Sequence, residues 1–92
     1  STENITALRK QIDEIDMSIL EILAKRMRIS REIGQYKKEH DMAILQSKRY
    51  DEIISKRVAD GKTMSMGEDF LNTIFEAIHA ESVRQQMEII NK

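Results

Sequence analysis

One uninterrupted stretch decides the fold: residues 5–38, which read ITALRKQIDEIDMSILEILAKRMRISREIGQYKK. Apolar and aromatic residues recur there at alternating steps of three and four, the spacing of a helix that packs along one face. These positions are Ile5, Leu8, Ile12, Ile15, Ile19, Ile22, Ile29, Ile33 and Tyr36, with Arg26 at a position of the same series. Gly34 weakens such a helix by only about 1 kcal/mol relative to alanine. We therefore predict one long helix over about residues 4–38.

Two shorter helices are expected after the long one. Ser47 is a suitable N-cap, and Gly61 is a suitable C-terminal stop, so we predict a short helix over about residues 47–60. A Ser-x-x-Glu capping box begins at Ser65 and predicts a third helix over about residues 66–90. The fold class is therefore all-α, with three helices.

Composition narrows the class of protein further. The chain has 92 residues, the size of a single domain, with no proline, no cysteine and a formal net charge of -1. The absence of cysteine excludes disulfides and thiolate metal sites. Balanced charge and only 4% aromatic residues disfavour nucleic-acid binding, and no apolar run approaches the roughly 18 residues of a membrane span. We expect a soluble, cytoplasmic domain that binds neither nucleic acid nor membrane.

The long helix has more apolar surface than its own chain can cover. At 1.5 Å per residue it would be about 50 Å long, and the two shorter helices are expected to cover about half of its apolar face. Each isoleucine or leucine left in water forgoes roughly 1.5–3 kcal/mol of burial, and a core this small is marginal by itself. We therefore expect an intertwined homodimer.

Two cationic residues share a face of the long helix. Burying the guanidinium of Arg26 at its apolar position would be costly without a partner. An ion pair that fixes helix register is one interpretation, and an anion receptor that grips a carboxylate bidentately is the other. Lys37 follows eleven residues later, close to three helical turns, on the same face. Taken alone, a lysine at a helix end is more often a solvated residue that the helix dipole favours.

Polar residues also interrupt the apolar stripe of the third predicted helix. Ser82 and Gln86 are four residues apart. They are either a satisfied pair of core polar groups or neutral hydrogen-bonding groups that line a pocket with Arg26 and Lys37. Arg9 lies about 25 Å from Arg26 along the helix axis, so these two cations of one chain cannot grip one small molecule. Arg9 of a second chain could reach the pocket.

No motif for nucleophilic or metal chemistry is present. His40 and His79 are isolated, without metal-ligand spacing, and His79 falls between the apolar stripes, where we expect a surface or boundary residue. The sequence contains neither a nucleophile elbow nor a phosphate-binding glycine loop. A pocket of cations and neutral donors suits an anionic substrate and chemistry that depends on positioning and electrostatics.

Several runs of this sequence resemble the all-helical class of chorismate mutases. They are LRKQIDEID at 8–16, LAKRM at 23–27, IGQYK at 33–37, Arg49, and ESVRQQ at 81–86. The resemblance extends from about residue 5 to residue 90. It implies an interlocked dimer of three-helix chains with two active sites that rearrange chorismate to prephenate, the branch step toward phenylalanine and tyrosine. It also implies that no metal or cofactor takes part.

The resemblance implies a role for each polar residue of the pocket. Arg26 would hold the enolpyruvyl carboxylate, and Arg9 of the partner chain would hold the ring carboxylate. Lys37 would donate to the ether oxygen and a carboxylate, and Gln86 would be the second donor to the ether oxygen. Ser82 would contact the ring carboxylate.

The start of the second predicted helix departs from the family pattern. Arg49 is implied to be a supporting cation of the pocket. Tyr50 stands where well-known members have a glutamate that contacts the ring hydroxyl, and Gln46 stands where an aspartate often precedes the helix. Tyr50 or a loop backbone group would replace the contact, and Gln46 could still bond the hydroxyl without a charge. We expect altered substrate affinity rather than lost chemistry.

Other functions remain open at this point. Isochorismate-pyruvate lyase uses the same scaffold, and the Arg49-Tyr50 departure is compatible with it. A regulatory or dimerisation module would explain the apolar stripe but has no use for so many inward-facing donors. Such mutases are also often fused to a shikimate-pathway synthase, prephenate dehydratase or prephenate dehydrogenase, so this chain could be one domain of a larger protein.

Overall fold

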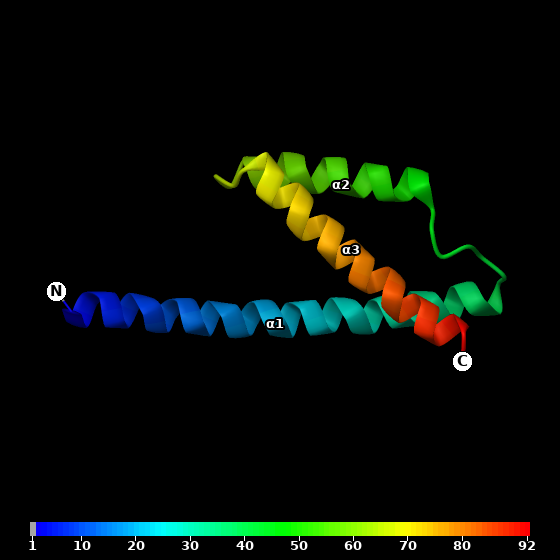
Figure 1. Ribbon diagram of the computed structural model, residues 1–92, viewed down its shortest axis with the longest axis horizontal. Coiled ribbons are helices and arrows are strands. Elements are labelled where there is room, and N and C mark those ends of the chain that lie inside the picture. Colours follow the sequence, from blue (N-terminus) through cyan, green and yellow to red (C-terminus); the bar gives the residue numbers. More distant parts are fainter. Residues whose placement is uncertain (1) are drawn as a thin grey trace.

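The fold is three α-helices connected by two short loops (Figure 1). The structure is a computed structural model and describes residues 2–92. Its helices are α1 (Thr2–Glu39), α2 (Ser47–Lys62) and α3 (Glu68–Ile90), and residues 2–92 contain no strand. The predicted all-α class is confirmed. None of the helices in this range is both long and apolar enough to cross a membrane.

The long helix α1 sets the dimensions of the molecule. Its 38 residues extend for about 57 Å at 1.5 Å per residue, close to the longest dimension of 59 Å. α2 runs back in the opposite direction, and α3 crosses obliquely from the end of α2 to the C-terminal half of α1 (Figure 1). α3 packs on both other helices, whereas α1 and α2 do not pack on each other. The expectation that both shorter helices cover α1 was therefore wrong, since α3 alone does so.

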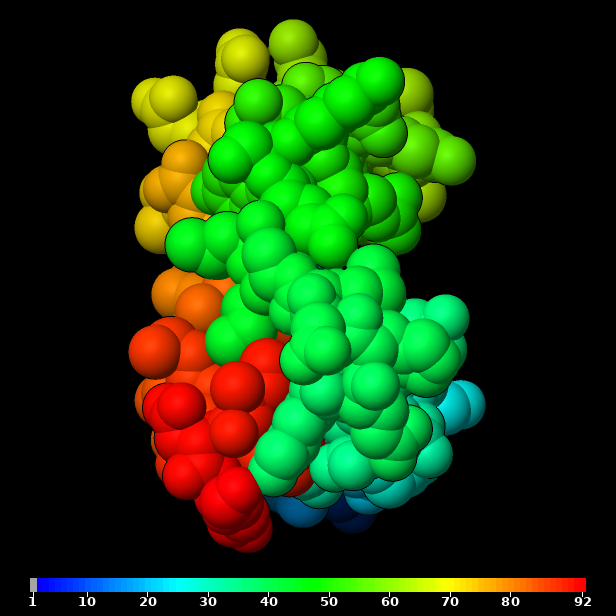
Figure 2. Space-filling view, turned by 90° about the vertical axis from the view of Figure 1, so that its right-hand side faces the viewer, coloured from blue at the N-terminus to red at the C-terminus, as the bar shows by residue number. Residues whose placement is uncertain are grey.

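The loop at residues 40–46 connects the end of α1 to the start of α2. Figure 2 shows this loop passing up one end of the molecule, beside the last turns of α3. The ammonium group of Lys37 donates a hydrogen bond of 2.8 Å to the carbonyl of Ile44, which ties the loop back to α1. Ile44 is half-buried, but Met42 and Leu45 are exposed. Only part of this apolar loop therefore folds onto the core.

Gly61 allows close packing between α2 and α3 and does not end α2. The helix continues through Gly61 to Lys62, and the φ angle of Gly61 is not positive. A Cβ atom at this position would lie 2.7 Å from Cδ1 of Leu71, a side chain that is only 2% exposed. The predicted glycine stop was wrong because this glycine provides space for a buried leucine rather than a left-handed turn.

The starts of α2 and α3 also differ from the predicted caps. Gln46, not Ser47, is the N-cap of α2, and its side chain donates to the carbonyl of Ala43 at 3.4 Å. α3 begins at Glu68 after Gly67, with no side-chain cap, so the predicted capping box does not form. Ser65 has φ 65°, a left-handed conformation that is incompatible with the extended backbone of an N-cap.

Few apolar side chains are buried within this one chain. Among residues 2–92, the buried apolar side chains are Met27, Val58 and Leu71. Along α1 the exposed ones are Ile5, Leu8, Ile12, Ile15, Met17, Ile19, Leu20, Ile22, Ile29, Ile33 and Tyr36. The N-terminal half of α1 extends beyond the region that α3 covers (Figure 1). The single chain thus leaves a continuous apolar face in solvent, an arrangement that marks an interaction surface.

Candidate functional site

Arg26 of α1 lies against Ser82 of α3. Its Nη1 donates to Ser82 Oγ at 2.7 Å. Desolvation lowers the pKa of Arg26, and the positive charge of Arg57 lowers it further. Within residues 2–92, Arg26 makes no ion pair. Arg26 therefore has no acidic partner in this part of the chain, as the ion-pair interpretation would require. Its guanidinium keeps a positive charge that can bind an anion.

Lys37 and Gln86 form the second contact between α1 and α3. Lys37 Nζ donates to Gln86 Oε1 at 3.0 Å, and Gln86 Nε2 donates to Ser30 Oγ at 3.1 Å. Desolvation lowers the pKa of Lys37. Lys37 is therefore part of a polar network at the helix contact, and the alternative of a simple solvated lysine is wrong.

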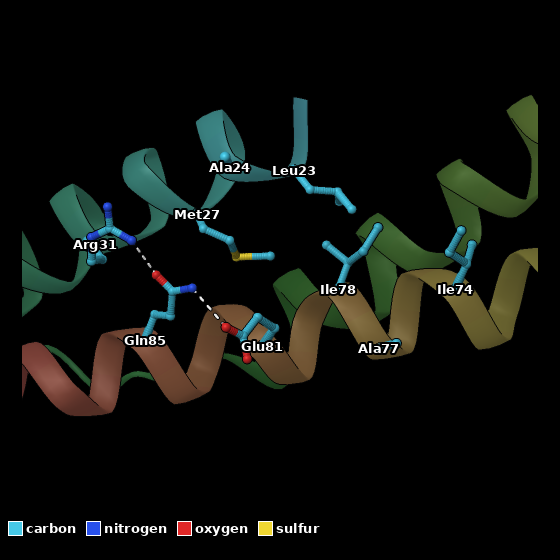
Figure 3. Close-up of a pocket in the computed structure, with 9 residues that line it drawn as sticks. All are labelled: Leu23, Ala24, Met27, Arg31, Ile74, Ala77, Ile78, Glu81 and Gln85. Carbon is cyan, nitrogen blue, oxygen red and sulfur yellow. Dashed lines mark hydrogen bonds between the residues drawn. The ribbon is translucent and has the colours of Figure 1, made fainter. Parts of the chain in front are cut away.

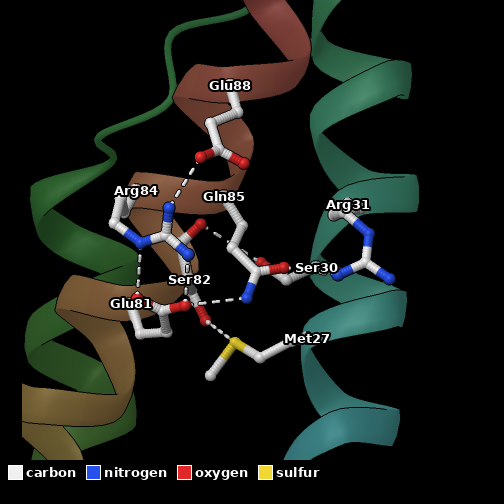
Figure 4. Close-up of polar contacts among 8 residues, drawn as sticks. All are labelled: Met27, Ser30, Arg31, Glu81, Ser82, Arg84, Gln85 and Glu88. Atoms are coloured by element: carbon white, nitrogen blue, oxygen red, sulfur yellow. Dashed lines mark hydrogen bonds and ion pairs between the residues drawn. The ribbon is translucent and has the colours of Figure 1, made fainter.

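Ser30 links the two pairs and was not assigned a role from sequence. It is 4% exposed, and its hydroxyl donates to the backbone carbonyl of Ser82 at 3.4 Å. Ser82 Oγ also contacts Met27 Sδ at 3.7 Å (Figure 4). The signal in the sequence was the four-residue step from Arg26 to Ser30, which places both side chains on one helix face.

Gly34 allows this network to form by letting α3 approach α1 closely. A Cβ atom at Gly34 would lie 3.1 Å from Gln86 Cα and 3.2 Å from Gln86 Cγ. Backbone at that distance would have to move by a few tenths of an ångström. The missing side chain therefore brings Gln86 within hydrogen-bond distance of Lys37 and Ser30.

Three predicted site residues lie away from the network in this chain. Arg9 is exposed and belongs to the N-terminal half of α1, the half that extends beyond α3 in Figure 1. Gln46 and Arg49 are exposed and line a surface depression at the start of α2, with Ser47, Lys48 and Glu52. The structure therefore brings together Arg26, Lys37, Ser82 and Gln86, and does not join Arg9, Gln46 or Arg49 to them.

Tyr50 of α2 contacts a histidine of α3 that the sequence pattern did not assign to the site. The rings of Tyr50 and His79 lie 4.1 Å apart between centroids, at an interplanar angle of 48°. His79 is half-buried, which fits the expected boundary position. Desolvation lowers the pKa of His79, and the positive charges of Arg26 and Lys37 lower it further. His79 is thus neutral at pH 7 and lies within the electrostatic range of both cations.

An apolar groove runs between α1 and α3 beside the polar network (Figure 3). Its volume is about 540 Å³. It is lined by Leu23, Ala24, Met27, Arg31, Ile74, Ala77, Ile78, Glu81 and Gln85. None of the five residues that these hydrogen bonds join lines the groove, so it differs in chemistry from the cationic cluster. Its apolar walls suit another protein side chain better than a dianion.

A charged cluster on α3 lies at the polar rim of this groove (Figure 4). Arg84 donates to both carboxylate oxygens of Glu81 at 2.7 Å, and to Glu88 at 2.6 Å. Gln85 donates to Glu81 at 2.8 Å and accepts a hydrogen bond from Arg31 of α1. The cluster therefore stiffens the exposed side of α3 and links it to α1.

We predict that Glu81 makes the stability of the fold sensitive to acid. Hydrogen bonds from Arg84 and then from Gln85 lower its pKa from 4.5 to about 2. A carboxylate whose pKa is lowered in the folded state contributes stability above its unfolded pKa. That contribution is lost as the pH falls from about 4.5 to about 2, and salt weakens it because the group is exposed. Urea unfolding of wild type and of Glu81→Gln at several pH values in this range measures the difference in their free energies of unfolding.

The control for this prediction is Glu76→Gln, on the same helix. Glu76 is exposed and has no hydrogen-bond or ion-pair partner in the part of the chain that the structure describes. The difference in free energy of unfolding between wild type and Glu81→Gln should decrease as the pH falls. This decrease should be larger than the one between wild type and Glu76→Gln. Equal pH dependence of the two gaps would contradict the assignment.

The chemistry of the network is that of an anion-binding site. It combines two cations, two hydroxyls and one amide within a helix contact. Residues 2–92 contain no group of three or more His, Asp or Glu side chains that could hold a metal ion. Such an arrangement can hold an anionic substrate in one conformation and stabilise negative charge that develops during a reaction.

Comparisons with known proteins agree with this chemistry. The family model for chorismate mutase type II matches residues 8–87. The T-protein of Enterobacter agglomerans is 28% identical over 78 residues, 85% of this chain and 21% of the relative. The bifunctional chorismate mutase/prephenate dehydratase of Buchnera aphidicola subsp. Acyrthosiphon pisum is 27% identical over 92 residues, 100% of this chain and 24% of the relative.

A further relative is closer to this chain in length. The 4-amino-4-deoxychorismate mutase of Streptomyces pristinaespiralis is 27% identical over 90 residues, which is 98% of this chain and 70% of the relative. The chain thus spans less than a quarter of the first two relatives and most of the third. The family match covers most of the chain and includes Arg9, Arg26, Lys37, Ser82 and Gln86. The chain belongs to the chorismate mutase type II family.

Proposed function

We propose that this chain catalyses the rearrangement of chorismate to prephenate. The observation that carries the proposal is the pair of contacts Arg26–Ser82 and Lys37–Gln86, at 2.7 and 3.0 Å, in which neither cation has an acidic partner among residues 2–92. Chorismate is a small dianion that must adopt a compact conformation to react. A preformed cationic site compensates its charge and reduces the entropic cost of that conformation.

The reaction needs no acid, base or nucleophile from the protein. One C–O bond of the ether breaks while one C–C bond forms, and negative charge develops on the ether oxygen. Lys37 can donate to that oxygen, and Gln86 Nε2 carries a second hydrogen besides the one donated to Ser30. Donors fixed by the protein before the reaction stabilise developing charge more effectively than water does. Arg26 would hold a carboxylate, with Ser82 beside it.

A second copy of this chain would complete the site. The uncovered apolar face of α1 is long enough to bury several isoleucines and leucines, each by about 1.5–3 kcal/mol. The apolar groove between α1 and α3 would receive side chains of the second copy. Arg9 is exposed on this same uncovered half of α1. In a dimer with two-fold symmetry each chain would then supply Arg9 to the other chain's site.

Two finer expectations belong with this proposal. We place the enzyme in the cytoplasm, and we expect its product to be passed to a prephenate-consuming enzyme. The name of the Buchnera relative combines chorismate mutase with prephenate dehydratase. Fusion to such a partner would place the two successive reactions in one protein.

Product identification tests the proposed reaction. The chain is incubated with chorismate and, separately, with isochorismate, and the products are identified by mass spectrometry and NMR. We expect prephenate from chorismate. Pyruvate and salicylate from isochorismate, with no prephenate from chorismate, would favour the lyase reaction and contradict the proposal.

A further inference from the structure

Arg57 of α2 is a third cation beside the polar network between α1 and α3. Desolvation lowers the pKa of Arg26, and the nearby positive charge of Arg57 lowers it further. α1 and α2 do not pack on each other, whereas α3 packs on both (Figure 1). The two guanidinium groups therefore come close to each other from helices whose backbones are apart.

The periodicity of α2 agrees with this placement. Arg57 follows Tyr50 by seven residues, which brings the two side chains to within about 20° of each other around the helix. Tyr50 contacts His79 of α3. Desolvation lowers the pKa of His79, and the positive charges of Arg26 and Lys37 lower it further. The face of α2 that carries Tyr50 and Arg57 is therefore the face directed toward the cations of α1.

The charge of Arg57 is not compensated within the chain. Arg57 is half-buried, and the ion pairs formed within residues 2–92 involve neither Arg57 nor Arg26. Arg57 also makes no hydrogen bond in this range. Two like charges that lie close together repel, and partial burial reduces the screening of that repulsion by salt. An anion between the two guanidinium groups would replace the repulsion by two attractions.

A carboxylate has the chemistry that this pair of arginines requires. A guanidinium can donate two parallel hydrogen bonds to a carboxylate. A carboxylate has about four lone-pair sites, so it can accept hydrogen bonds from two guanidinium groups at the same time. In the proposed function, Arg26 holds one carboxylate of the substrate. A carboxylate held there lies within the electrostatic range of Arg57 as well.

We propose that Arg57 is a substrate-binding residue that holds, together with Arg26, one carboxylate of the dianion. The inference rests on the proposed function, because it requires a dianionic substrate at Arg26. The carboxylate takes no part in the bonds that break and form. Its interaction with Arg57 is therefore present both in the bound substrate and in the transition state, and such an interaction lowers KM while leaving kcat unchanged.

Steady-state kinetics of Arg57→Gln and Arg57→Lys test the assignment. Arg57→Gln removes the charge and should raise KM for chorismate by about tenfold or more, with kcat within about threefold of the wild type. Arg57→Lys keeps the charge and should restore most of the affinity. Because Arg57→Gln also removes a like charge near Arg26, its thermal unfolding midpoint should equal or exceed that of the wild type.

Lys56→Gln is the matched control. Lys56 precedes Arg57 on α2, is exposed, and has no hydrogen-bond or ion-pair partner in the part of the chain that the structure describes. The change in net charge is the same, so any long-range effect on attraction of the dianion is common to both variants. The KM of Lys56→Gln should equal that of the wild type.

Anion binding is measured separately, without catalysis. Inorganic sulfate is the probe, and sodium chloride at equal ionic strength is the reference. A ligand that binds the folded state raises the thermal unfolding midpoint, so sulfate should raise that of the wild type and of Lys56→Gln more than that of Arg57→Gln. General stabilisation by sulfate is common to all three proteins, and the difference between them therefore reports the site.

An Arg57→Gln enzyme with the KM and the sulfate response of Lys56→Gln would overturn the inference. If this variant also forms a weaker dimer in sedimentation equilibrium, Arg57 instead pairs with an acidic side chain of a second copy. A raised KM that returns to the wild-type value at high chain concentration would likewise show that Arg57 acts through assembly. Failure of the wild type to convert chorismate contradicts the proposed function, and the sulfate response then decides whether Arg57 and Arg26 share an anion.

Discussion

Arg26→Ala lowers kcat/KM for chorismate by at least about a hundredfold, equivalent to about 2.7 kcal/mol of transition-state stabilisation. The guanidinium is hydrogen-bonded to Ser82 at 2.7 Å and has no acidic partner in residues 2–92. Its charge is therefore available to the substrate. Alanine removes that charge and leaves Ser82 Oγ without its donor. Steady-state kinetics of both proteins, with circular dichroism to check folding, measure the effect.

The control for this variant is Arg28→Ala. Arg28 is exposed on the same helix and has no hydrogen-bond or ion-pair partner in the part of the chain described. The change in net charge is identical, so any long-range effect on attraction of the dianion is common to both variants. Arg28→Ala should retain activity within a few-fold. Equal activity of Arg26→Ala and wild type would contradict the assigned site.

Replacing two isoleucines of the uncovered face by aspartate should abolish both assembly and activity. Ile15 and Ile19 are 57% and 47% exposed in the single chain. In a homodimer, Ile15→Asp with Ile19→Asp removes four buried side chains, a loss of about 6–12 kcal/mol. That is comparable to the whole stability of a typical domain, about 5–15 kcal/mol. We expect a monomeric, largely unfolded chain in sedimentation equilibrium and circular dichroism.

The matched control changes polar positions on the same part of α1. Gln11→Asp with Ser18→Asp adds the same two charges at exposed polar residues of α1. This variant should keep the assembly state and fold of the wild type. A double isoleucine variant with wild-type mass and activity would show that the apolar face of α1 is not the interface.

Periodicity in the sequence predicted the helices because helix packing depends on it directly. The alternating apolar series from Ile5 to Tyr36 led to a helix within two residues of the observed α1. Arg26, Ser82 and Gln86 were likewise visible as polar residues in apolar positions, and Lys37 by its eleven-residue spacing from Arg26. The structure joins these residues in two hydrogen-bonded pairs. These features depend on local spacing, which a single sequence displays.

Features that depend on contacts between distant residues were not visible. Gly61 resembled a helix stop, and only the nearness of Leu71 shows that it provides packing space. The contact of Tyr50 with His79 joins residues 29 positions apart on different helices, so no periodicity could reveal it. A partial signal existed, since His79 precedes Ser82 by three residues and therefore shares its helix face.

The central claim is that the site combines Arg26 of one chain with Arg9 of another, and mixing two inactive variants tests it most directly. Arg9→Ala and Arg26→Ala chains are unfolded together, refolded and assayed with chorismate. Random pairing makes about half of the dimers mixed, each with one intact site, so about one quarter of wild-type activity should return. No activity above that of the separate variants, with mixed dimers demonstrated by native mass spectrometry, would contradict the shared site.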